Sequence, residues 1–460
     1  MKKKHLRRML AGGMGVLATA GLGNSLQAQS ADALIDKLVE KGILSVKEAN
    51  EMREETDKNF TTAYQVKSGM SDWVTSFRIN GDLRGRFDGQ YSSNPNFVER
   101  DRWRYRLRVG ATAVIKDNFE VGMRLGSGDV DNAAGLTAGV DPISQNQSFQ
   151  NNASKKGIFL DLAYAKWTPI NNRDWSASLT VGKIENPFVF SDMVFDPDYT
   201  PEGASQQIAY NLSAKQVLKL NLGEFVLDEL GGSTQDPYLL GGQLGLESTW
   251  SKKVATSVGV GFLGITSSQQ LTSTAVPYIN RGNLRYVGAN GILGAPVHGF
   301  NSLIASAAMT YTLDSFPLYT GAFPIRPFGE FIHNTANSEQ NNGYNVGITF
   351  GKAGKKGTWE VTYRYKYLGG DAWWEQLADS DFGAFYQDKL VALLPPTARA
   401  AASGYWPGTN VRGHIVKASY SPYDSLTFNV TWFAAELIQE QNPGTDSNMN
   451  RIQVDAVWKF

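Results

Sequence analysis

The chain ends on the stretch Asn450-Arg451-Ile452-Gln453-Val454-Asp455-Ala456-Val457-Trp458-Lys459-Phe460, in which every second residue from Ile452 onward is apolar. This alternation is typical of a β-strand with one apolar and one polar face. It recurs along the chain in roughly sixteen segments of about ten residues, the length that a tilted strand needs to cross a bilayer. The sequence therefore predicts an all-β fold, a transmembrane antiparallel β-barrel of about 16 strands.

The pattern is clearest where Trp359 and Val361 alternate with Glu360 and Thr362. We expect strands at 77–91, 102–115, 119–126, 158–168, 175–183, 204–213, 216–227, 237–250, 254–266, 300–313, 322–334, 343–352, 357–368, 410–421, 425–436 and 449–460. Trp167 falls on the polar face of its segment, which predicts a bulge or an error of register at that point.

The connections between these segments alternate in length. Short ones include 116–118, 251–253, 351–357 and 421–424, whereas long ones span about 128–157, 184–203, 266–300 and 369–409. Outer-membrane barrels have short periplasmic turns and long external loops. A soluble β-sandwich has no physical reason to alternate its loops in this way, so the loop lengths support the barrel independently.

The N-terminal region has a different pattern. Residues 1–28 carry five Lys or Arg residues before an apolar run that begins at Met9, which indicates a secretory signal peptide cleaved after Ala28 or Ser30. Helical spacing and a capping box predict a short periplasmic helical hairpin over 31–58. This hairpin either has no chemical role or acts as a periplasmic tether or an oligomerisation element. Residues 59–72 form a linker, and 73–460 form the barrel.

Composition excludes several classes of protein. There is no cysteine, which excludes a lipid anchor on cysteine, disulfides and thiolate metal sites. Without residues 1–28 the chain has 39 basic and 44 acidic residues, so general nucleic-acid binding is not expected. No motif indicates a cofactor or a metal, and we expect neither.

Arginines dominate the inward face of the first three strands. The predicted basic wall consists of Arg84, Arg86, Arg102, Arg104, Arg106, Arg108 and Arg124. Guanidinium groups stay charged and bind phosphate or carboxylate through paired hydrogen bonds, so a wall of them favours anions. The alternative is an ordinary polar lumen in which these arginines pair with Asp82, Asp88 and Glu120.

The connection 184–203 combines aromatic and acidic residues. Its phenylalanines have little else to bury them, so we expect the loop to fold into the lumen as a constriction. The candidate constriction residues are Glu185, Asp192, Asp196, Asp198 and Glu202. Acids facing an arginine wall would create a transverse field and weaken net ion selectivity. A solvated surface loop is the alternative.

Several motifs carry a family resemblance. They are Leu34-Ile35-Asp36-Lys37-Leu38-Val39-Glu40-Lys41-Gly42-Ile43-Leu44 followed by Glu48-Ala49, Gly182-Lys183-Ile184-Glu185-Asn186-Pro187-Phe188, Ile325-Arg326-Pro327-Phe328-Gly329-Glu330, and the terminal Phe460. Through these the chain resembles the putative porins of the outer membrane and, more distantly, general and phosphate-selective porins. The resemblance implies a passive pore, a homotrimer and a third loop folded inward. Trp458 and Phe460 resemble the signal that the barrel-assembly machinery reads.

We conclude from the sequence that this is no enzyme but an outer-membrane porin, surrounded by lipid, that passes small hydrophilic solutes and ions by diffusion. A preference for anions is the finer expectation. His414, with Arg412, is predicted to face the lumen, and no nucleophile accompanies it. Two alternatives stay open. One is a channel specific for sugar, phosphate or carboxylate, with Trp373-Trp374 and Tyr405-Trp406 at its mouth, unless these aromatic residues only pack their own loop. The other is a structural anchor or adhesin.

Overall fold

The computed structural model describes residues 52, 70–94, 97, 99–129, 143–272, 276, 281–287, 293–383, 407–439 and 447–460. The expected signal peptide lies outside the described residues, as do Tyr405-Trp406, all of the helical hairpin but Met52 and most of the linker. Met1–Thr75 and Ser76–Phe460 form two compact units, and the second is the barrel. The first strand of the barrel begins at Val74, two residues before this boundary.

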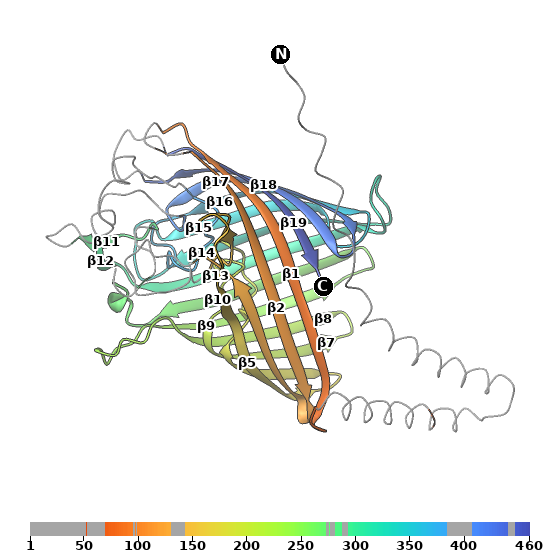
Figure 1. Cartoon of the computed structure of the whole chain (residues 1–460). Coiled ribbons are helices and arrows are strands. Elements are labelled where there is room, and N and C mark those ends of the chain that lie inside the picture. The colour runs from red at the N-terminus through yellow and green to blue at the C-terminus, as the bar shows by residue number, and fades with distance from the viewer. Residues whose placement is uncertain are drawn as a thin grey trace, which may run out of the picture. The chain divides into compact units, whose positions relative to one another are not determined.

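Sixteen long antiparallel strands make up the barrel wall (Figure 1). They are β1 (Val74–Tyr91), β2 (Arg100–Ile115), β3 (Phe119–Ser127), β5 (Ile158–Asn171), β6 (Trp175–Lys183), β7 (Glu202–Ser213), β8 (Gln216–Val226), β9 (Tyr238–Thr249), β10 (Val254–Ile265), β13 (Phe300–Leu313), β14 (Phe323–Asn334), β15 (Asn342–Gly351), β16 (Thr358–Leu368), β17 (Val411–Tyr423), β18 (Leu426–Leu437) and β19 (Met449–Lys459). Each strand expected from the sequence is present, so the predicted fold class is confirmed.

The remaining elements are short. The two-residue β4 (Gln147–Ser148) pairs with β2 beyond the end of β3, and β11 (Arg285–Val287) pairs with β12 (Leu293–Pro296) in a separate ribbon. Two 3-10 turns are η1 (Lys116–Asn118) and η2 (Ser268–Gln270). None of the helical turns in the described ranges has the length and apolar character that crossing a membrane requires.

The first and last long strands close the sheet. β1 pairs with β19 over ten positions, from Asp82 opposite Lys459 to Tyr91 opposite Asn450. Gly81 and Phe460 then exchange two backbone hydrogen bonds, of 2.9 and 3.1 Å. Closure pairs the backbone groups of both edge strands, as a sheet surrounded by lipid requires.

The two faces of the wall differ as the alternation predicts. Outward side chains such as Ile79, Val260 and Val346 are exposed and apolar, whereas inward Lys366 and Asn345 are buried in the lumen. Apolar residues outside and polar residues inside are what a lipid surround and an aqueous interior favour.

The prediction of a bulge near Trp167 is confirmed. In the pairing of β3 with β5, Arg124 lies opposite Leu162 and Leu125 opposite Leu160, which leaves Asp161 as an extra residue. One extra residue reverses the faces of a strand beyond it. Trp167 therefore points outward, where its ring stacks on Phe119 with centroids 5.7 Å apart.

The predicted inward direction of His414 and Arg412 is wrong. In β17 the residues that line the lumen cavity are Ile415 and Lys417, so Arg412 and His414 lie on the outer face. Ile415 is instead buried opposite Phe433. An apolar patch inside the barrel thus overrides the rule that polar residues point inward.

The apolar core of the barrel lies within the lumen. The connection from Ile184 to Pro201 turns inward, and Ile184, Met193 and Val194 are among its fully buried side chains. Residues 369–383, after β16, join the same buried cluster. These two connections therefore occupy the interior, and Leu271 and Val276 of the connection after β10 belong to the same buried cluster.

Gly182 marks the point where the first of these connections leaves the wall. It lies opposite Gly203, and its φ of +115° belongs to a region that residues with a side chain rarely adopt. A Cβ atom at Gly182 would also collide with the carbonyl oxygen of Ala163.

We therefore expect Gly182→Ala to lower barrel stability by roughly 1–3 kcal/mol, the usual cost of such backbone strain. The measurement is the temperature at which the compact, heat-modifiable form is lost on SDS gels. Gly231→Ala is the matched control, because nothing lies within 4 Å of a Cβ atom at Gly231. Equal transition temperatures in the two variants would contradict the assignment of strain to Gly182.

Candidate pore constriction

A cavity of about 850 Å³ occupies the lumen beside the inward connection 184–201. Charged groups line it on three sides: Arg84, Arg86, Arg106 and Arg108 from β1 and β2, Asp192, Asp196 and Asp198 from the connection, and Arg326, Glu330, Arg364 and Lys417 from β14 to β17. The side from β8 to β13 is lined by the polar residues Asn221, Gln243, Ser257 and Ser306 and by the ion pair of Lys219 with Glu247. We call residues 184–201 the inner loop.

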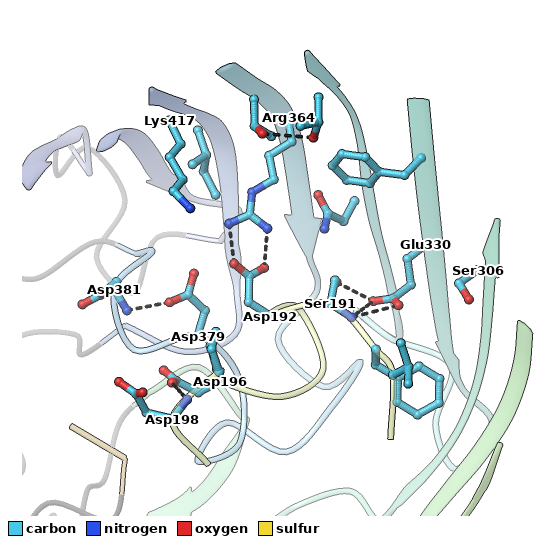
Figure 2. Close-up of a pocket in the computed structure, with 18 of the residues that line it drawn as sticks. Ser191, Asp192, Asp196, Asp198, Ser306, Glu330, Arg364, Asp379, Asp381 and Lys417 are labelled. Atoms are coloured by element: carbon cyan, nitrogen blue, oxygen red, sulfur yellow. Dashed lines mark hydrogen bonds and ion pairs between the residues drawn. The ribbon is translucent and has the colours of Figure 1, made fainter. Parts of the chain in front are cut away.

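Asp192 holds the inner loop to β16. Its Oδ1 accepts a hydrogen bond of 2.7 Å from Nη1 of Arg364, and its Oδ2 accepts a second one from Nη2 (Figure 2). Lys366 lies 3.5 Å away. Burial opposes ionisation of this carboxyl, but the two cations outweigh burial and lower the pKa of Asp192. Asp192 is therefore an anion that is fully compensated.

Asp198 holds the same loop to a second part of the wall, five strands away from β16. Its two oxygens lie 2.9 and 3.1 Å from Nη1 of Arg106 in β2, and Arg108 is 3.4 Å away. Since Asp192 contacts β16 and Asp198 contacts β2, the inner loop crosses the lumen between these strands. Ser191 completes the support with a backbone hydrogen bond of 3.0 Å to Glu330 in β14.

Asp196 is buried between the inner loop and residues 369–383. It accepts hydrogen bonds of 2.9 and 2.8 Å from the backbone N–H and the hydroxyl of Ser380, and another from the N–H of Asp198. Burial, together with repulsion from Asp379 and Asp198, raises the pKa of Asp196 to about 8. At neutral pH this carboxyl is therefore mostly uncharged.

Glu185 and Glu202 lie away from the cavity. Glu185 pairs with Arg124 at the start of the inner loop, and Glu202 lies 3.1 Å from Lys183 at its end. Both glutamates are more than half exposed. Of the five candidate constriction residues, the structure brings together Asp192, Asp196 and Asp198 and leaves these two at the wall.

Residues 369–383 form a second loop within the lumen, which we call the latch loop. It binds the inner loop through the backbone: Asp196 N–H to Leu377 O at 2.7 Å, and Asp379 N–H to Asp192 O at 3.0 Å. The indole N–H of Trp373 donates to Val194 O at 2.8 Å. The two loops therefore form one hydrogen-bonded unit.

Sequence reasoning missed the latch loop. The sequence left open whether Trp373 and Trp374 lie at a pore mouth or pack their own loop, and both are almost fully buried, as packing requires. The available signal was the number of apolar residues in a long connection, Phe382 among them, that only the lumen could bury. The latch loop also places Asp381 at 3.3 Å from Arg86 and 3.0 Å from Arg451.

The arginines of the predicted basic wall all lie on the inner side, and most have carboxylate partners. Arg86 binds Asp455 and Asp381, Arg102 binds Asp88, Arg104 lies 3.9 Å from Asp88 and from Asp129, Arg106 and Arg108 bind Asp82 and Asp198, and Arg124 binds Asp161 and Glu185. Arg84 is the exception among the seven: its one hydrogen bond to a described residue goes to Asn146.

Charges of both signs are nearly balanced around the cavity. Eight Lys or Arg and nine Asp or Glu residues line it, and one of those acids, Asp196, is mostly neutral at pH 7. The cavity is therefore polar, with opposite charges close together. It can orient dipolar solutes, because opposite charges on facing surfaces create a field across the opening.

Comparison with known proteins gives a family match. A family model described as "Putative porin" matches residues 92–280. The barrel is similar to the high-pH structure of Pseudomonas putida OprB, with a TM-score of 0.51, 11% identity, and coverage of 85% of this chain and 99% of that chain. It is also similar to outer-membrane expressed OmpT of Vibrio cholerae, with a TM-score of 0.41, 10% identity, and coverage of 85% and 99%. At such identity the likeness to OprB shows a shared fold. No curated protein sequence matches this chain.

The pKa of Asp196 makes the docking of the two loops pH-dependent. A carboxyl with a raised pKa in the folded state contributes stability that is complete below its unfolded pKa, near 4, and is lost as pH rises toward about 8. We expect wild-type stability, relative to Asp196→Asn, to fall by up to about 1.4 kcal/mol per pH unit in this window. Unfolding temperatures of both proteins between pH 5 and 9 measure this. Parallel curves would contradict it.

Proposed function

We propose that this chain, whose residues 92–280 match a family model described as "Putative porin", is an outer-membrane pore for passive diffusion of small hydrophilic solutes and ions. The observation that supports this best is the closed sixteen-stranded wall around a polar cavity that the inner loop and the latch loop narrow. A barrel of this size is wide enough to hold an aqueous channel.

The charge arrangement supports weak net selectivity with a local anion preference. Most arginines of the basic wall pair with acids from β1, β5 and β19, from the inner loop or from the latch loop. In the described part of the chain, no extended surface of unpaired positive charge therefore lines the cavity. The anion preference expected from the sequence then depends on the few cations that have no carboxylate partner.

The alternatives have less support. Trp373 and Trp374 are buried in the latch loop and offer no ring face for a sugar to stack on. An enzyme would need a nucleophile and a base within reach of each other, and His414, the histidine expected in the lumen, lies on the outer face. An anchor or adhesin would not need a charged passage through its interior.

The finer features belong to the proposal as well. Residues 1–28 would direct export, and 31–58 would form a periplasmic hairpin after a linker that ends at residue 72. The outer face would contact lipid, and Trp458 and Phe460 would present the strand that the barrel-assembly machinery recognises. We further propose a homotrimer, the assembly that the sequence resemblance implies.

The direct test of the pore is single-channel current through the purified, folded protein in a planar bilayer under a salt gradient. We expect ohmic steps, grouped in threes if the protein is trimeric, and a small reversal potential because the charges nearly cancel. The absence of conductance from a heat-modifiable barrel would exclude an open diffusion pore.

Replacing Arg106 and Arg108 by Gln should shift selectivity toward cations, because Asp82 and Asp198 then lose their partners. An uncovered charge at about 4 Å from a passing ion is worth about 1 kcal/mol in water, so roughly a fivefold change in the permeability ratio is expected. The control is Arg412→Gln, which removes an equally paired arginine from the outer face. An unchanged reversal potential in the Arg106/Arg108 variant would remove these arginines from the selectivity mechanism.

A further inference from the structure

Arg84 differs from every other arginine of the basic wall. It extends from β1 into the lumen cavity and is 9% exposed. Its Nη2 donates a 2.7 Å hydrogen bond to Oδ1 of Asn146, and, unlike the other six, it has no carboxylate oxygen of a described residue within 4.0 Å. Its Nε, like those of Arg102, Arg104 and Arg106, is buried without a partner among the described residues. Of the residues that the structure describes, none bonds its Nη1. Part of this guanidinium is thus held in place, and part of its donor capacity is free.

The nearby carboxylates are already occupied. Asp455 accepts 2.7 and 2.9 Å hydrogen bonds from Nε and Nη2 of Arg86, and Asp198 binds Arg106. Both acids, and Asp381, which already pairs with Arg86 and Arg451, are close enough to influence Arg84 electrostatically, but none is within 4.0 Å of it. Arg86 and Arg106 themselves add positive charge beside Arg84.

A buried guanidinium with free donors and no ion pair is unfavourable unless a counter-ion binds to it. A buried cation without a counter-ion carries a large desolvation penalty, and neighbouring cations increase the cost of keeping it charged. Arginine does not relieve the penalty by losing its proton, because its intrinsic pKa is too high. A bound anion would relieve it by supplying both the missing charge and acceptors for the free donors.

We propose that Arg84, oriented by Asn146, is an oxyanion-binding subsite of the pore, which accepts the phosphate or carboxylate group of a passing solute. The proposal rests on the pore function and assigns its preferred solutes to small molecules with such a group. The guanidinium is planar and its donors are directional, which suits an oxyanion better than a halide.

The side chain of Asn146 has a positioning role in this subsite. Its Oδ1 accepts from Arg84, while its Nδ2 donates to Ser144 Oγ at 3.1 Å. The amide is therefore fixed with its oxygen toward the guanidinium. Among the described residues, one donor of Arg84 is used to hold the group and the others are not, so binding should be weak enough for the solute to leave, as transport requires.

The test is the chloride current of single channels in planar bilayers as inorganic phosphate or succinate is added. We expect both anions to reduce the current of the wild type in a saturable way. Arg84→Gln should weaken the apparent affinity at least about tenfold, because a hydrogen bond to a charged group is worth roughly 1.5–3 kcal/mol. The phosphate and succinate series, compared with each other, identify which oxyanion the subsite favours.

Two further variants separate binding at Arg84 from the effect of removing any positive charge from the cavity. Arg326→Gln is the matched control, because Arg326 lines the same cavity, lies over the Phe328 ring and makes no ion pair with a described residue. It removes the same charge from the cavity and should weaken the apparent affinity much less than Arg84→Gln does, because Arg326 is exposed whereas Arg84 is buried and held by Asn146. Asn146→Ala keeps the charge of Arg84 but frees its orientation, and it should weaken saturation severalfold even if Arg84→Gln fails to fold.

Each outcome of these measurements supports or overturns the oxyanion subsite at Arg84. An equal loss of saturation in Arg84→Gln and Arg326→Gln would show that only the overall field acts, and it would overturn the subsite. Ohmic conductance of the wild type without saturation by either anion would also overturn the subsite but leave the pore intact. No conductance at all would contradict the pore function itself.

Discussion

Pairing of every backbone N–H and C=O group within the wall is the constraint on which this structure depends. Water cannot satisfy these groups inside a lipid layer, so the sheet has to close on itself, and β1 meets β19 for that reason. Once the wall is closed, its outer face is apolar and suits lipid. The residues that give the protein its chemistry must then lie inside, and the two inner loops bring further side chains there.

Compensation of charge is the second organising feature. An arginine-rich interior would repel itself, and acids from the wall and from both loops reduce that repulsion by pairing with most of the guanidiniums. The same pairs hold the inner loop across the lumen. Structural support and control of selectivity are therefore carried by the same side chains, so a change made for one purpose affects the other.

The strands of the wall could be predicted from the sequence because lipid imposes a period of two on each strand and the loops differ in length at the two ends. The contacts inside the barrel were harder to predict. Arg364 and Asp192 are 172 residues apart, and no local pattern indicates that they meet. The latch loop was missed because its aromatic residues suit a binding surface as well as a buried loop. His414 was placed wrongly because Ile415 and Phe433 form an apolar patch inside the lumen.

The pairing of β1 with β19 has a geometric consequence. In a closed barrel, the register at the seam sets the shear, and shear and strand number together set the tilt of the strands and the radius. The match of Asp82 with Lys459 and of Tyr91 with Asn450 therefore determines the cross-section of the lumen as well as closing it. A seam displaced by two residues would keep all sixteen strands and their inward faces, yet it would enclose a different bore.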